Sequence, residues 1–103
     1  MASSLNFIKT GKVVGTGADK KIVLGFQPRS VTLFNAAAGG LVTCWKTDQM
    51  ATRYAKKAVA AGTTTFADDM CVIESDGFTI GDDSDLNVAG EDIYYEAIQG
   101  KND

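Results

Sequence analysis

Short segments in which apolar and polar side chains alternate, each ended by a turn, occupy most of this chain. Ile22, Leu24 and Phe26 recur at every second position, and Val31 and Leu33 do so a few residues later. A spacing of two places such side chains on one face of an extended strand. The pattern therefore predicts β-strands, separated by turns that contain glycine, proline and asparagine.

The C-terminal part, residues 76–97, contains a short strand, a polar turn and a second alternating strand. Ile93, Tyr95 and Ala97 are predicted to face the core, and the residues between them to face solvent, as in an antiparallel strand with one wet side. About seven to eight short strands fit into a chain of this length. The sequence thus predicts an all-β fold, either a compact antiparallel β-sandwich or a small barrel.

The length of 103 residues is that of one domain. We expect residues 1–10 to form an N-terminal arm or a first strand, and residues 11–103 to form a single β domain. No apolar run approaches the roughly 20 residues that span a bilayer, so no membrane protein is predicted. The first residues lack the basic start and apolar segment of a secretory signal, and we expect the chain to stay in the cytoplasm where it is made.

Residues 47–62 are ambiguous. Thr47 or Asp48 could cap a helix, and Gly62 could end it. Predicted strands nevertheless flank this segment on both sides. We therefore predict extended structure for residues 47–62.

Side chains suited to catalysis or metal binding are scarce in this sequence. Histidine is absent, which removes the usual general base and the commonest metal ligand. Cys44 and Cys71 belong to no C-x-x-C pair, so a zinc site has no support. They are interpreted first as buried apolar residues, with a disulfide formed after release from the cell as the alternative. The sequence predicts no catalytic, cofactor-binding or metal-binding residue, and no enzyme.

One acidic turn has the spacing of a calcium loop. Asp83, Asp85 and Asn87 match the first ligand positions of such a loop. Val88 stands where glycine is needed, and Tyr94 where the bidentate glutamate belongs. A solvated turn without metal is the favoured interpretation.

Charge is distributed unevenly. Residues 1–67 hold nine basic side chains against Asp19 and Asp48, whereas residues 68–103 hold eleven acidic ones against Lys101. Such asymmetry indicates either pairing between strands within the fold or complementary faces between subunits. The pI of about 4.8 argues against a continuous phosphate-binding surface, and nucleic-acid binding is not predicted.

Two stretches carry a family resemblance: G-T-G-A-D-K-K-I-V-L-G-F-Q-P-R-S-V-T-L-F-N at residues 15–35, and the D-G-F-T-I-G strand, Asn-containing loop and Y-Y-E-A strand within residues 76–97. The chain resembles structural proteins of tailed-bacteriophage particles. The resemblance implies a virion structural role and, given the small size and single domain, that of a head decoration (cement) protein on the capsid surface. A tail or fibre-base component of the same build is one alternative. A carbohydrate-binding β-sandwich, with Trp45, Tyr54 and Tyr94 stacking on sugar rings, is another.

The partners implied by this resemblance are the major capsid protein and further copies of the chain, with a closed homotrimer favoured. An N-terminal arm that becomes ordered on docking is the preferred capsid contact. The candidate assembly contacts are apolar or aromatic residues with a basic rim: Leu5, Phe7, Ile8, Trp45, Arg53, Tyr54, Lys56, Lys57, Phe66 and Met70.

Overall fold

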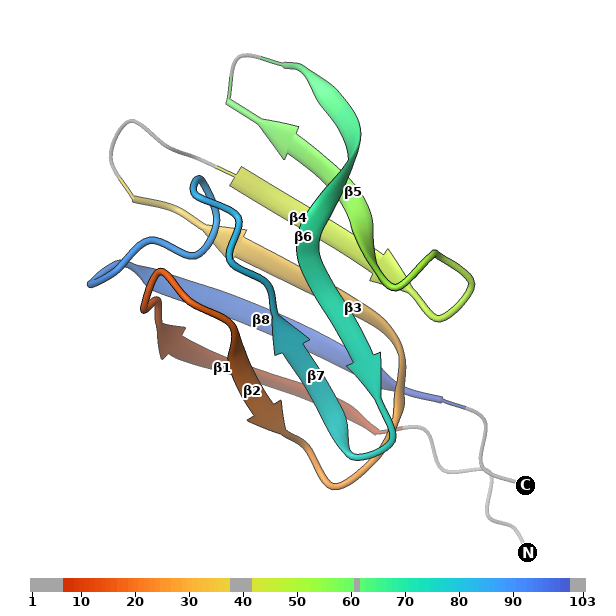
Figure 1. Cartoon of the computed structure of the whole chain (residues 1–103). Coiled ribbons are helices and arrows are strands. Elements are labelled where there is room, and N and C mark those ends of the chain that lie inside the picture. Colours follow the sequence, from red (N-terminus) through yellow and green to blue (C-terminus); the bar gives the residue numbers. More distant parts are fainter. Residues whose placement is uncertain (1–6, 38–41, 61, 101–103) are drawn as a thin grey trace, which may run out of the picture.

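The computed structural model describes residues 7–37, 42–60 and 62–100, and these form eight antiparallel strands in one sheet (Figure 1). The strands are β1 (Ile8–Val14), β2 (Lys20–Val23), β3 (Pro28–Asn35), β4 (Val42–Thr47), β5 (Arg53–Val59), β6 (Thr64–Glu74), β7 (Gly77–Ile80) and β8 (Asp92–Gln99). Their order across the sheet is β1-β8-β3-β4-β5-β6-β7-β2. The predicted all-β class is confirmed.

The sheet curls into a half-barrel, in which β6 lies over β3 and β4, β7 over β8, and β2 in front of β1 (Figure 1). A bulge in β6 accompanies the bend, because Arg53 and Ala55 on β5 pair with Cys71 and Ala67 on β6, so β6 advances four positions while β5 advances two. Bulges of this kind increase the local twist and bend of a strand. The edge strands β1 and β2 do not pair with each other, so the barrel stays open along this seam.

The core fills the inside of the curl and follows the predicted alternation. Val31 and Leu33 of β3 and Ile93 and Ala97 of β8 are completely buried. Phe78 of β7 crosses the interior to meet Tyr95 of β8 edge-to-face, with ring centroids 5.5 Å apart. The inward orientation predicted for Ile93, Tyr95 and Ala97 is thus confirmed.

Residues 47–62 contain a turn followed by β5, and no helix among the described positions. The ammonium group of Lys46, whose residue is only 2% exposed, donates hydrogen bonds to the carbonyl oxygens of Ala51 and Tyr54 at 2.6 and 2.7 Å. Burial lowers the pKa of Lys46. These bonds hold the β4–β5 turn. The predicted extended structure is confirmed for Arg53–Val59, whereas residues 48–52 form the turn.

The N-terminal residues that the structure describes belong to the sheet. Ile8 begins β1, and the carbonyl oxygen of Phe7 accepts a hydrogen bond from the amide of Gln99 at 2.8 Å. Of the two expectations for residues 1–10, residues 8–10 form part of a first strand. Residues 1–6, including Leu5, lie outside the described residues.

Both cysteines are buried and free. Cys44 and Cys71 are each 0% exposed, and burial raises the pKa of Cys44 to about 12 and raises the pKa of Cys71 as well. The interpretation as buried apolar residues is confirmed. Within the described ranges, no helix is long and apolar enough to cross a membrane.

Candidate binding face

The side of the sheet that faces away from the core carries exposed aromatic side chains. Trp45 on β4 lies opposite Thr32 on β3 and Lys56 on β5, and Lys56 in turn lies opposite Phe66 on β6. Paired positions point to the same side of a sheet. One line across the outside of the sheet consists of Thr10, Glu96, Thr32, Trp45, Lys56 and Phe66.

A second line runs beside the first, two positions along each strand. Phe34 on β3 and Tyr94 on β8 are paired, and their ring centroids are 6.5 Å apart. The full line consists of Lys12, Tyr94, Phe34, Thr43, Ala58 and Thr64. The two lines together are called the outer face below.

Large apolar side chains on the outer face remain in contact with solvent. Tyr94, Trp45 and Phe66 are 46%, 44% and 56% exposed. Between β1 and β3 the surface forms a shallow open hollow of about 520 Å³, with Phe34, Tyr94 and Glu96 in its wall. Scattered exposed apolar residues are normal, but contiguous ones mark interaction surfaces. The neighbouring Phe34 and Tyr94 rings, with Trp45 on the next strand of the same face, fit the second description.

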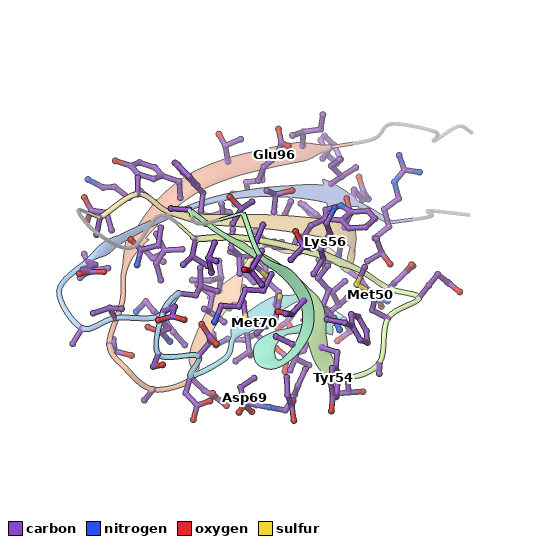
Figure 2. The ribbon with its side chains drawn as sticks, turned by 90° about the horizontal axis from the view of Figure 1, so that it is seen from above. Met50, Tyr54, Lys56, Asp69, Met70 and Glu96 are labelled. Carbon is purple, nitrogen blue, oxygen red and sulfur yellow. The ribbon has the colours of Figure 1, made fainter. Side chains whose placement is uncertain are left out.

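The outer face wraps around the curl of the sheet. Glu96 projects from one side of the molecule, whereas Tyr54 lies on the opposite side (Figure 2). Tyr54 stacks on Phe66, with ring centroids 5.2 Å apart and ring planes inclined by 25°. The flatter part, formed by β1, β8, β3 and β4, therefore carries Phe34, Tyr94 and Trp45 on its outer face, and the Tyr54–Phe66 pair lies around the bend.

Arg53, one of the predicted rim residues, is engaged in ion pairs within the chain. Its guanidinium group pairs with Asp19, Asp69 and Asp82 at 3.1, 3.1 and 3.5 Å, and hydrogen bonds to Asp19 and Asp69 raise its pKa. Arg53 and Asp69 both have a positive φ, of 71° and 60°, which costs about 1–3 kcal/mol per residue. These ion pairs help to hold the strained bulge of β6.

Lys57 is likewise engaged within the chain. Its ammonium group lies 3.1 Å from Asp83 and 2.8 Å from Asp85, and the side chains of Lys57 and Asp83 are only 14% and 13% exposed. Desolvation lowers the pKa of Lys57, but the hydrogen bonds with Asp85 and Asp83 outweigh it, and the pKa is raised overall. Two candidate calcium ligands thus bind a lysine.

The third candidate ligand, Asn87, is 1% exposed and binds backbone groups. Its side-chain oxygen accepts hydrogen bonds from the amides of Thr16 and Gly17 at 2.9 and 3.3 Å. Its amide nitrogen donates to the carbonyl oxygens of Ala18 and Gly81 at 2.6 and 2.9 Å. The turn is therefore held by side-chain contacts, not simply solvated.

Met70 is wrongly placed by the sequence analysis. Its side chain is completely buried and lies within the body of the molecule (Figure 2), so it cannot contact a partner in this structure. Trp45, Lys56 and Phe66 lie together on the outer face, whereas Phe7 and Ile8, 55% and 62% exposed, lie at the far end of β1.

Phe34 was not among the predicted contacts, and Tyr94 was considered only as a sugar-stacking residue. The alternation of β3 and β8 contains the signal for both, because Phe34 neighbours the inward Leu33, and Tyr94 lies between the inward Ile93 and Tyr95. A large apolar residue at an outward position of a strand departs from the alternating pattern, and this departure indicates a candidate contact residue.

Charge pairing within the fold, one of the two explanations of the uneven charge, is confirmed for several residues. Lys21 pairs with Glu74 and Asp76 at 2.7 and 2.8 Å, in addition to the ion pairs of Arg53 and Lys57. Among the described residues, no group of histidine, cysteine, aspartate or glutamate side chains is placed to hold a metal ion. Comparisons with protein-family models, curated proteins and solved structures found no match to the chain.

Proposed function

We propose that the chain is a structural protein of a virus particle that binds the outside of the capsid and stabilises it, without catalysing a reaction. The observation that carries this proposal is the outer face, where Trp45 and Tyr94 are 44% and 46% exposed on one side of the sheet. Tryptophan and tyrosine are the residues that most often dominate binding energy at protein interfaces. The resemblance of residues 15–35 and 76–97 to tailed-phage particle proteins supports the capsid as the partner.

The mechanism needs only binding. A protein that binds the assembled, expanded shell more tightly than its dissociated subunits stabilises the shell by mass action. Capsid symmetry repeats the contact many times, so a modest interface per copy is sufficient. The major capsid protein is the proposed partner, and the capsid surface of the particle is the proposed location, after synthesis in the host cytoplasm.

The outer face suits such a contact because its apolar rings are surrounded by polar groups. Thr10, Lys12, Thr32 and Glu96 line the same hollow as Phe34 and Tyr94. An apolar centre with a polar rim is the usual anatomy of a protein interface. Lys12 and Glu96 carry opposite charges, which would fix the orientation of the partner.

Carbohydrate binding is the second candidate, because exposed Trp45 and Tyr94 could also stack on sugar rings. Tyr54, the third residue of that hypothesis, is stacked on Phe66, which covers one face of its ring. This leaves a smaller set of platforms than the sequence alone indicates.

The test is a mixing experiment with expanded capsids that lack the protein. The purified chain should sediment with these capsids and occupy fixed symmetric sites in reconstructed images. Binding to tails alone would instead support the tail or fibre-base alternative, and binding to glycans on an array would support the carbohydrate alternative. Either of these results, without capsid binding, would contradict the proposal.

A further inference from the structure

The outer edge of β1 exposes unpaired backbone groups. The amide of Gln99 bonds to the carbonyl oxygen of Phe7, and the amide of Gly15 bonds to the carbonyl oxygen of Glu91, so odd-numbered residues of β1 direct their backbone groups toward β8. The even-numbered residues direct theirs away from β8. No strand among the described residues pairs with that edge. The residues with outward backbone groups are Ile8, Thr10, Lys12 and Val14.

We propose that this edge pairs with the same edge of a second copy of the chain, antiparallel about a two-fold axis at Gly11. In this register Ile8 lies opposite Val14 of the second copy, and Thr10 lies opposite Lys12 of the second copy. All of the outward backbone groups of β1 are then satisfied across the axis. A two-fold axis makes the contact self-complementary, so one surface serves both copies.

The side chains favour this register. Ile8 and Val14 are 62% and 50% exposed, and the pairing brings them together at both ends of the contact, where each covers the other. Edge strands commonly carry lysines that oppose pairing, and β1 has Lys9 and Lys12. In the proposed register Lys9 lies opposite Val13 and Lys12 opposite Thr10, so no two lysines face each other.

Other pairings are less favourable. A shift of the axis to Lys12 places the two Lys12 side chains directly opposite each other, which is destabilising. A shift to Thr10 places Ile8 opposite Lys12 and so separates the exposed apolar side chains of Ile8 and Val14. The other sheet edge, β2, has only four residues, and its outward backbone groups belong to Lys21 and Val23, because Leu24 bonds to Asp76 of the neighbouring turn.

The contact joins two sheets into one continuous sheet and places two outer faces side by side. It predicts a dimer where the family resemblance implies a trimer. Complexes that bury less than roughly 1,200 Å² are typically weak or transient. A contact through one pair of strands falls below that area. The dimer is therefore expected to dissociate on dilution.

Analytical ultracentrifugation of the full chain at rising concentration tests the proposal. The mass should approach twice 10.9 kDa. Thr10→Pro removes an outward amide without removing a β1–β8 hydrogen bond, and should keep the chain monomeric. Val23→Pro is the matched control, because it removes an outward amide of β2 and should leave dimerisation unchanged. A wild-type monomer at every concentration, a trimer, or loss of the dimer in Val23→Pro alone would overturn the proposal.

Disulfide trapping tests the register without depending on the proline variants. A mixture of Thr10→Cys and Lys12→Cys chains should form a cross-linked heterodimer under mild oxidation, faster than mixtures of Thr10→Cys with Val14→Cys, or of Ile8→Cys with Lys12→Cys. The native Cys44 and Cys71 are fully buried and do not compete. Equal rates for all mixtures, or a faster rate for either shifted mixture, would overturn the proposed register.

Discussion

The ring of Tyr54 on β5 stacks on the ring of Phe66 on β6, with centroids 5.2 Å apart. The two strands meet where the sheet curls, beside the bulge that follows Ala67. The stacked pair therefore fastens the outside of the bend, while Met70 and Cys71 are buried on its inside.

Tyr54 and Phe66 should show coupled effects on stability. Aromatic pairs contribute about 0.5–1.5 kcal/mol beyond the area they bury, so Tyr54→Ala and Phe66→Ala together should cost less than the sum of the two single changes, by about that amount. Urea unfolding of the four proteins of the cycle measures this difference. Additive effects would show that the stacking contributes nothing.

Asn87→Ala should be among the most destabilising single changes outside the apolar core. It leaves the amides of Thr16 and Gly17 and the carbonyl oxygens of Ala18 and Gly81 without their partner, and buried unsatisfied groups cost about 1–3 kcal/mol each. We expect a loss of at least about 2 kcal/mol in the free energy of unfolding. Exposed Ser84→Ala, in the same loop, is the control and should change stability little.

Lys57 and Asp83 form a mostly buried ion pair at 3.1 Å. Lys57→Met should cost about 3 kcal/mol, because it leaves carboxylates without their cation. Combining it with Asp83→Asn should recover part of that loss, since one uncompensated charge is then removed. Chemical unfolding of Lys57→Met, Asp83→Asn and the double variant measures the three losses in the free energy of unfolding. If the loss in the double variant equalled the sum of the two single losses, the coupling would be contradicted.

The ion pairs of Lys21 should make stability depend on acid pH. Hydrogen bonds from Lys21 lower the pKa of Glu74 and of Asp76 below their usual values of 4.5 and 3.8. A carboxyl group with a lowered folded-state pKa contributes stability above its unfolded pKa and loses it as the pH falls through its folded pKa. Unfolding midpoints from about pH 6 to about pH 3 should therefore fall.

Lys21→Met should make that fall smaller, because both carboxyl groups then lose the lysine that lowers their pKa. Lys9→Met is the control, since Lys9 makes no ion pair with any residue that the structure describes. An equally steep acid dependence in Lys21→Met and in the wild type would rule out this assignment.

The alternation of apolar and polar residues in β3 and β8 was sufficient to predict which side chains enter the core. In a regular strand, successive side chains point to opposite faces of the sheet. Alternation depends only on the local sequence, which is why the fold class could be predicted. The reason for Gly77 of the D-G-F motif is not local, since a Cβ there would overlap the carbonyl oxygen of Ile22 on β2.

Met70 shows where this reasoning fails. The bulge in β6 inserts extra positions between Ala67 and Cys71, and a positive φ at Asp69 is not implied by its residue type. Met70 and Cys71 are both completely buried, so two successive residues face the interior where strict alternation allows only one. The acidic partners of Arg53 and Lys57 lie 16–34 residues away, and the sequence order alone did not identify them.

The most direct test of the proposed function compares the melting temperature of expanded capsids after adding the wild-type chain or Trp45→Ser. Trp45 is 44% exposed on the outer face, so its replacement should leave the isolated chain folded but weaken binding by more than about 2 kcal/mol. Val23→Ser, at a residue 65% exposed on β2, is the matched control. The proposal predicts that the wild type and Val23→Ser raise the capsid melting temperature and that Trp45→Ser does not; equal protection by all three, or by none, would contradict it.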